Sequence, residues 1–225
     1  MLKLFSTLAA MSFSLSAMGE TFTYKNYTLD RDANIVYGGG LEWLQWDKTV
    51  GFSAMDALAV YRADGWRLAT NQEMADLFNS FDLNGVFDAD ENSGLKTQLK
   101  TPRNSYDEAN YFIELFGDTY RAAGFTYNSI DPVEYSGAVY GSDEDGNGKL
   151  KSAEVMDEYF HEGGYDVWGV AYISSDTLLP DRVADPRGIA LVREISQVPL
   201  PSTFSLYLMA IFGLIGIGGR KRFIK

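Results

Sequence analysis

The sequence predicts an α+β fold in which a small antiparallel sheet is flanked by helices. Short segments rich in β-branched and aromatic residues alternate with turns that contain glycine, asparagine or aspartate, which is typical of strands. Between them lie segments whose apolar residues follow the helical spacing and whose first residues are good N-terminal caps. The chain has 225 residues. With both ends set aside, residues 20–197 are the size of one domain and are long enough to bury a core.

Strands are expected in the parts of the chain that are rich in β-formers. Residues 21–29 predict a strand or a pair of strands, and residues 30–34 predict the turn after it. In residues 41–46 the apolar side chains do not alternate, which predicts a strand buried on both faces. Further strands are expected at 66–69, 125–127, 139–140, 166–173 (as a central strand) and 188–194.

Three helices are expected from their caps. Ser53 is a good N-cap for a helix over 53–62 that ends before Gly65, with Met55, Leu58, Ala59 and Arg62 on one face. Thr70 and Glu73 form a capping box for a helix over 71–81, which buries Met74, Leu77, Phe78 and Phe81. Ser105 and Glu108 form a second capping box for a helix over 106–116 that ends at Gly117, with Tyr111, Phe112 and Leu115 inward.

The strongest chemical motif is an acidic loop over residues 143–154, which fits the EF-hand calcium loop at its diagnostic positions. Gly148 stands where that loop turns sharply, and a helix over 152–161 would carry the last ligand. An all-oxygen ligand set suits Ca²⁺ better than octahedral Mg²⁺. The predicted metal ligands are the side chains of Asp143, Asp145 and Asn147, the backbone carbonyl of Lys149 and the two carboxylate oxygens of Glu154.

The surroundings of this loop leave its role open. No helix is expected before Asp143 and no partner loop follows, so the motif resembles the single calcium loops of extracellular proteins, with a dissociation constant of roughly 10⁻⁴–10⁻³ M. The alternative is an acidic turn without a metal. Asp88, Asp90 and Asn92 have similar spacing, but Ser93 and Leu99 stand at the glycine and glutamate positions, so they are a weaker candidate.

The first 19 residues predict a signal peptide. Lys3 supplies the positive charge, residues 4–15 form a short apolar, serine-containing segment, and Ala17 and Gly19 are small residues at the −3 and −1 positions of a cleavage site. Cleavage is expected after Gly19. The alternative is an uncleaved anchor, for which the apolar run is short.

The last 28 residues, 198–225, contain a proline motif, an uncharged apolar segment and a basic cluster, in that order. As a helix, residues 204–219 would be about 24 Å long at roughly 1.5 Å per residue, slightly short of a hydrocarbon core of roughly 30 Å. Basic side chains that extend to the interface can make up the difference, and they are expected on the cytoplasmic side. The sequence therefore predicts a transmembrane helix over 204–219, held at its end by Arg220, Lys221 and Arg222.

This tail resembles the PEP-CTERM sorting signal of Gram-negative bacteria, with Pro199, Leu200 and Pro201 in the place of its Pro-Glu-Pro motif. The resemblance implies cleavage by a membrane transpeptidase of the exosortase type. It also implies transfer from the inner membrane to the cell surface or the exopolysaccharide. Leu200 departs from the usual glutamate. The alternative is a plain C-terminal membrane anchor.

Composition excludes several functions. The formal net charge is −12, and all 31 acidic residues lie between the two ends, which argues against nucleic acid and anionic lipid as partners. Cysteine is absent, so the chain has no disulfides, thiol nucleophile or cysteine-based zinc site. A single histidine excludes multi-histidine metal sites and argues against a Ser-His-Asp triad.

Residues 65–73, Gly-Trp-Arg-Leu-Ala-Thr-x-x-Glu, resemble a conserved block of C-type-lectin-like folds, in which one helix precedes the strand and another follows it. The segments around 40–44 and 57–59 extend a resemblance to a domain of exported PEP-CTERM proteins. The resemblance to C-type-lectin-like folds implies that residues 188–194 form a closing strand near the first strand. The disulfides and the calcium-and-sugar motifs of typical C-type lectins are absent, so their sugar site does not carry over. Trp66 and Arg67 are expected in the core and in a buried ion pair.

Three functions are compatible with these features. The first is a non-catalytic cell-surface or matrix protein, stabilised by calcium, that binds a polysaccharide or another surface protein. The second is a glycoside hydrolase with two carboxylates roughly 5–10 Å apart in one cleft. The third is an inert envelope spacer. The first accounts for most of the features, and no catalytic residue is predicted.

Overall fold

The computed structural model describes residues 20–99, 104–122, 133–158, 160–162, 165–167 and 169–195. The predicted signal peptide (1–19), the sorting motif and transmembrane segment (198–225) and the expected strand at 125–127 lie outside these ranges. Within the described ranges, no helix has the length and apolar character needed to cross a membrane. The chain divides into two compact units, Met1–Arg193 and Glu194–Lys225.

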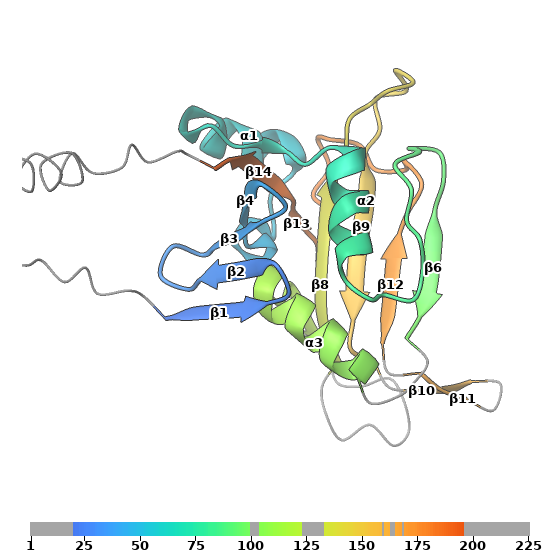
Figure 1. Ribbon diagram of the computed structural model, residues 1–225. Helices are drawn as coiled ribbons and strands as arrows, with labels where there is room; N and C mark the ends of the chain where they lie inside the picture. The colour runs from blue at the N-terminus through green and yellow to red at the C-terminus, as the bar shows by residue number, and fades with distance from the viewer. Residues whose placement is uncertain are drawn as a thin grey trace, which may run out of the picture. The chain divides into compact units, whose positions relative to one another are not determined.

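The structure confirms an α+β fold, but with two six-stranded sheets instead of one small one. The first sheet has the order β1-β2-β3-β4-β14-β5, and its strands pair antiparallel where their register is known (Figure 1). Its strands are β1 (Thr21–Tyr24), β2 (Tyr27–Asp30), β3 (Ile35–Gly38), β4 (Leu41–Leu44), β14 (Leu191–Glu194) and β5 (Arg67–Leu68). Residues 21–29 are therefore a pair of strands, and β4 is buried along its whole length, as predicted.

The second sheet has the order β13-β8-β9-β12-β6, with β7 paired to β8. Only the short pair of β13 and β8 is parallel among these described strands. The strands are β13 (Gly188–Ile189), β8 (Val133–Tyr140), β9 (Lys151–Met156), β12 (Val170–Ile173), β6 (Leu95–Gln98) and β7 (Tyr120–Ala122), and a separate hairpin joins β10 (Phe160–Glu162) to β11 (Tyr165–Val167).

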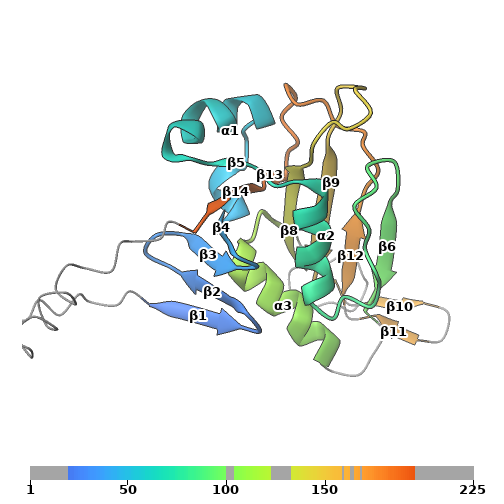
Figure 2. The ribbon, with the colours of Figure 1, turned by 45° about the horizontal axis from the view of Figure 1, so that its top comes forward.

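The helices are α1 (Ala54–Tyr61), α2 (Asn71–Ser80) and α3 (Asn104–Phe116), with short 3₁₀ turns η1 (Trp46–Thr49) and η2 (Arg62–Asp64). Ser53 caps α1 by accepting a hydrogen bond from Asp56 N, as predicted. Of the residues predicted to share one face of α1, Leu58 packs against a core cluster, whereas Met55 is 59% exposed. Ala54 and Ala57 are the buried residues of this helix, which lies beside β5 (Figure 2).

The capping box of α2 is confirmed. Thr70 Oγ1 accepts from Glu73 N at 3.2 Å, and Glu73 Oε2 accepts from Thr70 N at 2.8 Å. The Glu73 carboxylate also accepts two hydrogen bonds from Arg67, at 2.8 and 2.6 Å. Trp66 is only 5% exposed, so its predicted core position is confirmed. The ion pair of Arg67 with Glu73 is present, but it is not buried as predicted, because the Arg67 side chain is 42% exposed.

α3 lies between the two sheets and makes contacts with β1 and β2 on one side and β8 and β9 on the other (Figure 1). Phe112 and Leu115 of α3 are fully buried, as predicted, whereas Tyr111 is 37% exposed and lies against Tyr24. The main core combines aromatic and aliphatic residues of α2, α3 and both sheets. A smaller cluster lies under α1 and includes Trp66.

Two predictions for the C-terminal half are wrong. The helix expected over 152–161 is a strand, β9, followed by β10. Ala153 and Val155 of this segment are buried in the strand between β8 and β12, and this tertiary burial outweighs the helical propensity of its sequence. The central strand expected over 166–173 is two strands, β11 and β12, and only β12 lies in the sheet, between β9 and β6.

The capping box gives a prediction about acid stability. Burial by itself raises the pKa of Glu73, but the hydrogen bonds from Arg67 and Thr70 outweigh burial and leave its pKa below the ordinary value. A carboxylate whose pKa is lowered by folding stabilises the fold above its unfolded pKa, and this contribution is lost as the pH falls through the folded value. We therefore expect Glu73→Gln to lower Tm at pH 7, and the difference from wild type to disappear as the pH is lowered below about 4.

Thermal unfolding of both proteins from pH 7 to pH 3 measures this difference. Asp76→Asn, at an exposed position of the same helix, is the matched control and should leave a small difference at every pH. If Tm of Glu73→Gln lies as far below that of wild type at pH 3 as at pH 7, the proposed stabilisation by the ionised Glu73 carboxylate is wrong.

Candidate metal centre

The acidic motif forms the loop between β8 and β9, at one end of the second sheet (Figure 1, yellow). Three glycines shape it with positive φ angles: 116° at Gly141, 77° at Gly146 and 75° at Gly148. An L-amino acid with a side chain rarely adopts this conformation. Gly148 therefore makes the sharp turn that the sequence pattern requires of its sixth position.

Carboxylate and amide oxygens of this loop face its own backbone. Asp143 Oδ2 accepts from Gly148 N at 2.9 Å, and Asp145 Oδ1 accepts from Asn147 N at 2.9 Å. Asn147 Oδ1 accepts from Lys149 N at 2.8 Å. These short-range bonds wrap residues 143–149 into a compact turn, as residue types that favour Asx turns predict.

A third carboxylate reaches this turn from a distant part of the chain. Glu91 lies in the acidic segment between α2 and β6, and it is only 5% exposed. One carboxylate oxygen from each of Glu91, Asp143 and Asp145 lies within 4.8 Å of the other two. Glu91 Oε2 also accepts from Glu144 N at 2.7 Å, which ties the two segments together. This cluster of acidic residues can hold a metal ion.

Two other contacts fix the position of the cluster. Asp176, from the segment after β12, is buried; its backbone N donates to Glu91 O at 2.9 Å, and its Oδ2 accepts from the amide of Asn147. Asn71, the first residue of α2, donates from Nδ2 to Ser142 O at 3.2 Å and to Glu144 Oε1 at 3.1 Å. The turn is thus attached to a helix and to two other segments, so its geometry is set before any ligand arrives.

A buried lysine lies beneath the cluster. Lys151, the first residue of β9, is 1% exposed, and its ammonium donates to Asp90 O and to Ser93 O, the latter at 3.1 Å. Burial lowers the pKa of Lys151, although the nearby carboxylates of Asp88 and Asp90 act in the opposite direction. Lys151 holds the backbone on both sides of Glu91 and so helps to place the Glu91 carboxylate.

The predicted ligands do not all come together. Asp143 and Asp145 belong to the cluster, and Asn147 lies beside it with its amide nitrogen toward Asp145 and Asp176. Glu154 does not join them: on β9 it lies opposite Gly137 of β8 and forms an ion pair with Arg187. The predicted position for the last ligand depended on a helix that is absent. The ligand role of the Lys149 carbonyl stays a prediction.

The weaker motif at 88–92 forms its own turn. Asp88 Oδ1 accepts from Asp90 N at 3.1 Å and from the Ser93 hydroxyl, and Asp90 Oδ1 accepts from Asn92 N at 2.9 Å. Sequence reasoning considered these three residues and missed Glu91 between them. The available signal was an acidic residue in the middle of a turn-forming segment, but burial of Glu91 depends on contacts with residues 144 and 176, which no local pattern reveals.

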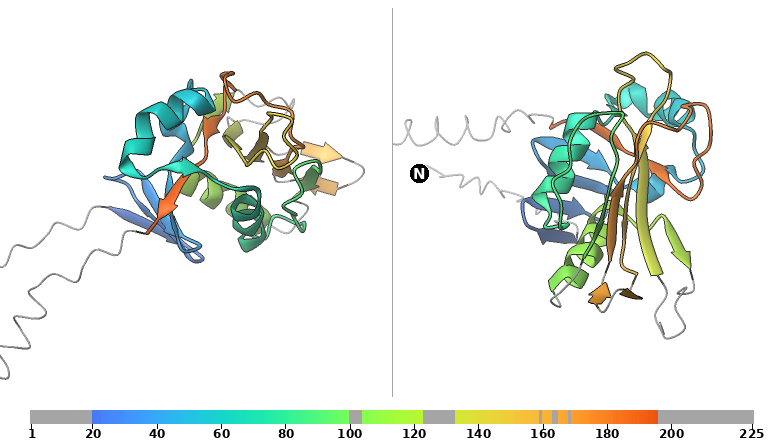
Figure 3. Two further views of the ribbon diagram at one scale, coloured as in Figure 1. Left: turned by 90° about the horizontal axis from the view of Figure 1, so that it is seen from above. Right: turned by 90° about the vertical axis from the view of Figure 1, so that its right-hand side faces the viewer.

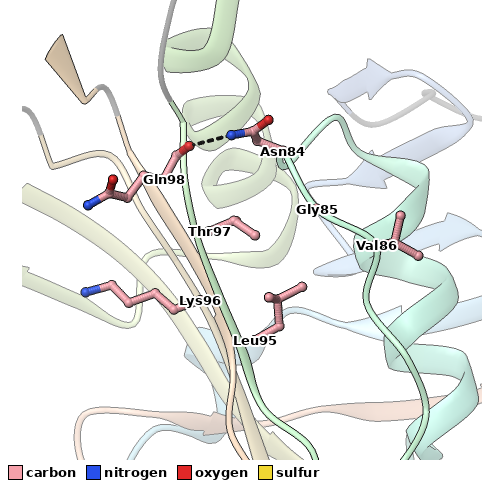
Figure 4. A pocket seen from close by; sticks show the side chains of 7 residues that line it. All are labelled: Asn84, Gly85, Val86, Leu95, Lys96, Thr97 and Gln98. Atoms are coloured by element: carbon pink, nitrogen blue, oxygen red, sulfur yellow. Dashed lines mark hydrogen bonds between the residues drawn. The ribbon is translucent and has the colours of Figure 1, made fainter. Parts of the chain in front are cut away.

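A groove lies along β6, the outer strand of the second sheet (Figure 4). It is an open groove of about 640 Å³ lined by Asn84, Gly85, Val86, Leu95, Lys96, Thr97 and Gln98. Asn84 Nδ2 donates to Gln98 O at 2.8 Å across one end of the groove. Lys96 is the one ionisable residue in this lining, and no carboxylate accompanies it, so the groove does not resemble a catalytic or metal site.

Comparison of the chain with family models, with curated proteins and with solved structures finds no match.

The buried lysine gives a prediction about the acidic segments. Lys151→Met should remove the ammonium donor from the carbonyls of Asp90 and Ser93. The Asp90 carbonyl keeps a hydrogen bond from Ser93 N at 3.3 Å, whereas the Ser93 carbonyl loses its donor from Lys151. Loss of a partner for a buried polar group costs about 1–3 kcal/mol, so the free energy of unfolding should fall by roughly that amount.

Urea denaturation of the two proteins measures the change. Lys149→Met, in the same loop but exposed, is the matched control and should change stability little. Equal stabilities of Lys151→Met and wild type would show that the ammonium does not hold these carbonyls in solution.

Proposed function

We propose that this chain is a non-catalytic, calcium-stabilised domain that is exported and displayed at the cell surface or in the extracellular matrix. The observation that carries the calcium part is the burial of Glu91 next to Asp143 and Asp145. Three carboxylates within 4.8 Å repel one another unless a cation or a proton neutralises them. A preformed set of carboxylate oxygens from three acidic side chains suits a hard divalent cation.

The composition of the site favours Ca²⁺. Carboxylates, the Asn147 side chain after a rotation of its amide, and the Lys149 carbonyl would supply an irregular oxygen shell, which Ca²⁺ accepts more readily than Mg²⁺ does. In this proposal Glu91 takes the place of the closing acid of the loop, and Asp176 is a further acid within reach of Asn147. Glu154 is excluded from the shell because Arg187 already engages it.

The C-type-lectin-like relationship remains part of the proposal. It is supported by the order α1, β5, α2 around the block at 65–73. The closing strand expected over 188–194 is wrong in detail: these residues form β13 and β14 in different sheets, and β14 lies between β4 and β5 and not beside β1. The absence of cysteine means that packing and a metal, not disulfides, would stabilise such a domain outside the cell.

Calcium binding predicts a thermal shift. Adding CaCl₂ to the metal-free full-length chain should raise Tm, and at a tenfold excess over the dissociation constant the gain in stability is about 1.4 kcal/mol. Glu91→Gln and Asp143→Asn should each remove most of the gain. Glu154→Gln is the matched control: it should alter the starting Tm but leave the calcium-dependent shift in place.

Differential scanning fluorimetry in 0.1–10 mM CaCl₂ (about the range set by ~10⁻⁴–10⁻³ M affinities) and in the same MgCl₂ series measures these shifts. No shift at the highest calcium concentration would overturn the calcium proposal. If Glu154→Gln abolishes the calcium-dependent rise in Tm and Glu91→Gln does not, Glu154 and not Glu91 is the closing ligand, as the sequence motif predicts.

The export part of the proposal rests on the order of features in residues 198–225. Pro199, Leu200 and Pro201 would mark the cleavage region for an exosortase-type transpeptidase. Residues 204–219 would lie in the inner membrane, and Arg220, Lys221 and Arg222 would stay on its cytoplasmic side. The mature domain would then reach a polysaccharide or a surface protein.

Fractionation of a Gram-negative host that contains an exosortase tests this part. Wild type should be found as a membrane precursor and a shorter released form. Replacing Pro199 and Pro201 with alanine should leave the precursor in the membrane. Leu200→Glu, which restores the motif of the resembled family, is the matched control and should be cleaved at least as well. A full-length chain in the cytosol with both termini intact would refute export.

A further inference from the structure

The second sheet has a face that α2 and α3 do not cover. Figure 3 (right) shows both helices on one side of β8, β9 and β12. Directly paired residues of antiparallel strands project to the same face. Ala138 of β8 and Ala153 of β9 are paired and belong to the core under the helices. The neighbouring pairs, Tyr135 with Met156 and Gly137 with Glu154, therefore project to the opposite face.

This opposite face contains a pocket of about 270 Å³. That volume is near the lower limit of small-molecule pockets, roughly 300 Å³, and suits a ligand with one ring. The pocket combines residues of β7, β8 and β9 with one residue that follows β9 and two that precede β13. Its lining is Tyr120, Val133, Tyr135, Glu154, Met156, Glu158, Pro186 and Arg187.

Three polar groups make up its floor. Glu154 is 7% exposed and Tyr135 is 8% exposed. Arg187 donates from Nε to Glu154 Oε1, and both of these charged groups act on the Tyr135 hydroxyl. Burial, and then the charge of Glu154, raise the pKa of Tyr135, so its hydroxyl stays protonated. The floor therefore offers a hydroxyl, a carboxylate and a guanidinium in a fixed arrangement.

A glycine makes this arrangement possible. A Cβ atom on Gly137 would lie 2.5 Å from Tyr135 Cε1 and 2.7 Å from the Tyr135 hydroxyl oxygen. The ring of Tyr135 thus lies against Gly137, whose strand partner is Glu154. The three polar groups meet because this one position has no side chain.

The rim of the pocket is apolar and partly exposed. Tyr120 is paired with Tyr135 across β7 and β8, and it is 48% exposed, so part of its side chain is accessible to a ligand. Val133, Met156 and Pro186 complete the rim. An apolar wall around a few convergent polar groups is the usual composition of a small-molecule site.

Charge narrows the class of ligand. The pocket holds two carboxylates, Glu154 and Glu158, against one guanidinium that is already engaged by Glu154. An anionic ligand would be repelled by this balance. A neutral sugar ring has hydroxyls for the floor and an apolar face of C–H groups for the exposed ring of Tyr120.

We infer that the pocket formed by Tyr120, Tyr135, Glu154 and Arg187 binds a single neutral saccharide ring. This inference rests on the proposed role as a non-catalytic binding domain, and it assigns a binding site to that role. It does not depend on the metal centre, because none of the residues that line the pocket belongs to the acidic cluster.

Saturation-transfer NMR on the full-length chain tests it, with the methyl glycosides of glucose, galactose, mannose and N-acetylglucosamine as probes and methyl glucuronide as the anionic comparison. A ring of this size should bind with a dissociation constant on the order of 1 mM. Tyr120→Ala and Tyr135→Phe should each weaken binding roughly tenfold. Tyr37→Ala, at a half-exposed tyrosine of the other sheet, is the control and should leave binding unchanged.

The inference would be overturned by no saturable binding of any neutral glycoside, by stronger binding of the glucuronide, or by binding that both Tyr120→Ala and Tyr135→Phe leave intact. Glu91→Gln separates this proposal from the calcium proposal. Unchanged sugar binding in that variant supports the pocket, whereas its loss would place the sugar at the acidic loops and overturn the assignment. Release of methanol from a bound glycoside would refute the non-catalytic role and leave the pocket as the binding site.

Discussion

The aromatic packing of α3 is the interaction on which the rest of the described fold depends. Phe112 places its ring 5.5 Å from that of Trp46, 5.0 Å from Phe81 and 4.6 Å from Phe116. These residues come from α3, from η1 and from the end of α2, so one cluster joins segments that are far apart in the sequence. Without cysteine, no covalent bond can do this. Edge-to-face and tilted aromatic contacts therefore supply both apolar burial and a defined geometry.

This packing determines which face of the second sheet the helices cover. Because side chains alternate along a strand, successive residues of β9 then lie on opposite faces. Lys151 is buried at the end of the sheet where the two acidic segments meet, and Ala153 and Val155 lie in the core. Glu154 lies on the opposite face beside Arg187 and Tyr135. A shift of one residue in register would exchange these two sets. One strand thus contributes a buried cation to the proposed metal centre and a buried carboxylate to the proposed saccharide pocket.

The candidate metal centre contains one part that local sequence patterns predict and one part that they do not. The turn over 143–149 could be predicted because glycines at fixed positions and Asx side chains act within a few residues of their own backbone. The closing acid could not be predicted. Position 12 of the motif, Glu154, required a helix, and the segment became a strand because β8 and β12 bury it on both sides. Glu91 enters the cluster through contacts with residues 144 and 176, more than 50 positions away.

The sequence by itself determined the α+β class, the strand conformation at residues 21–29, the capped starts of α1 and α2, and the turn at Gly148. These depend on short-range hydrogen bonds and on backbone preferences that act within a few residues. The tertiary structure decided the division into two sheets, the face that α1 buries, the conformation of residues 151–156 and the partners of Glu91 and Glu154. Those choices are set by which distant surfaces can be removed from water together, and that is a property of the packed chain and not of any one segment.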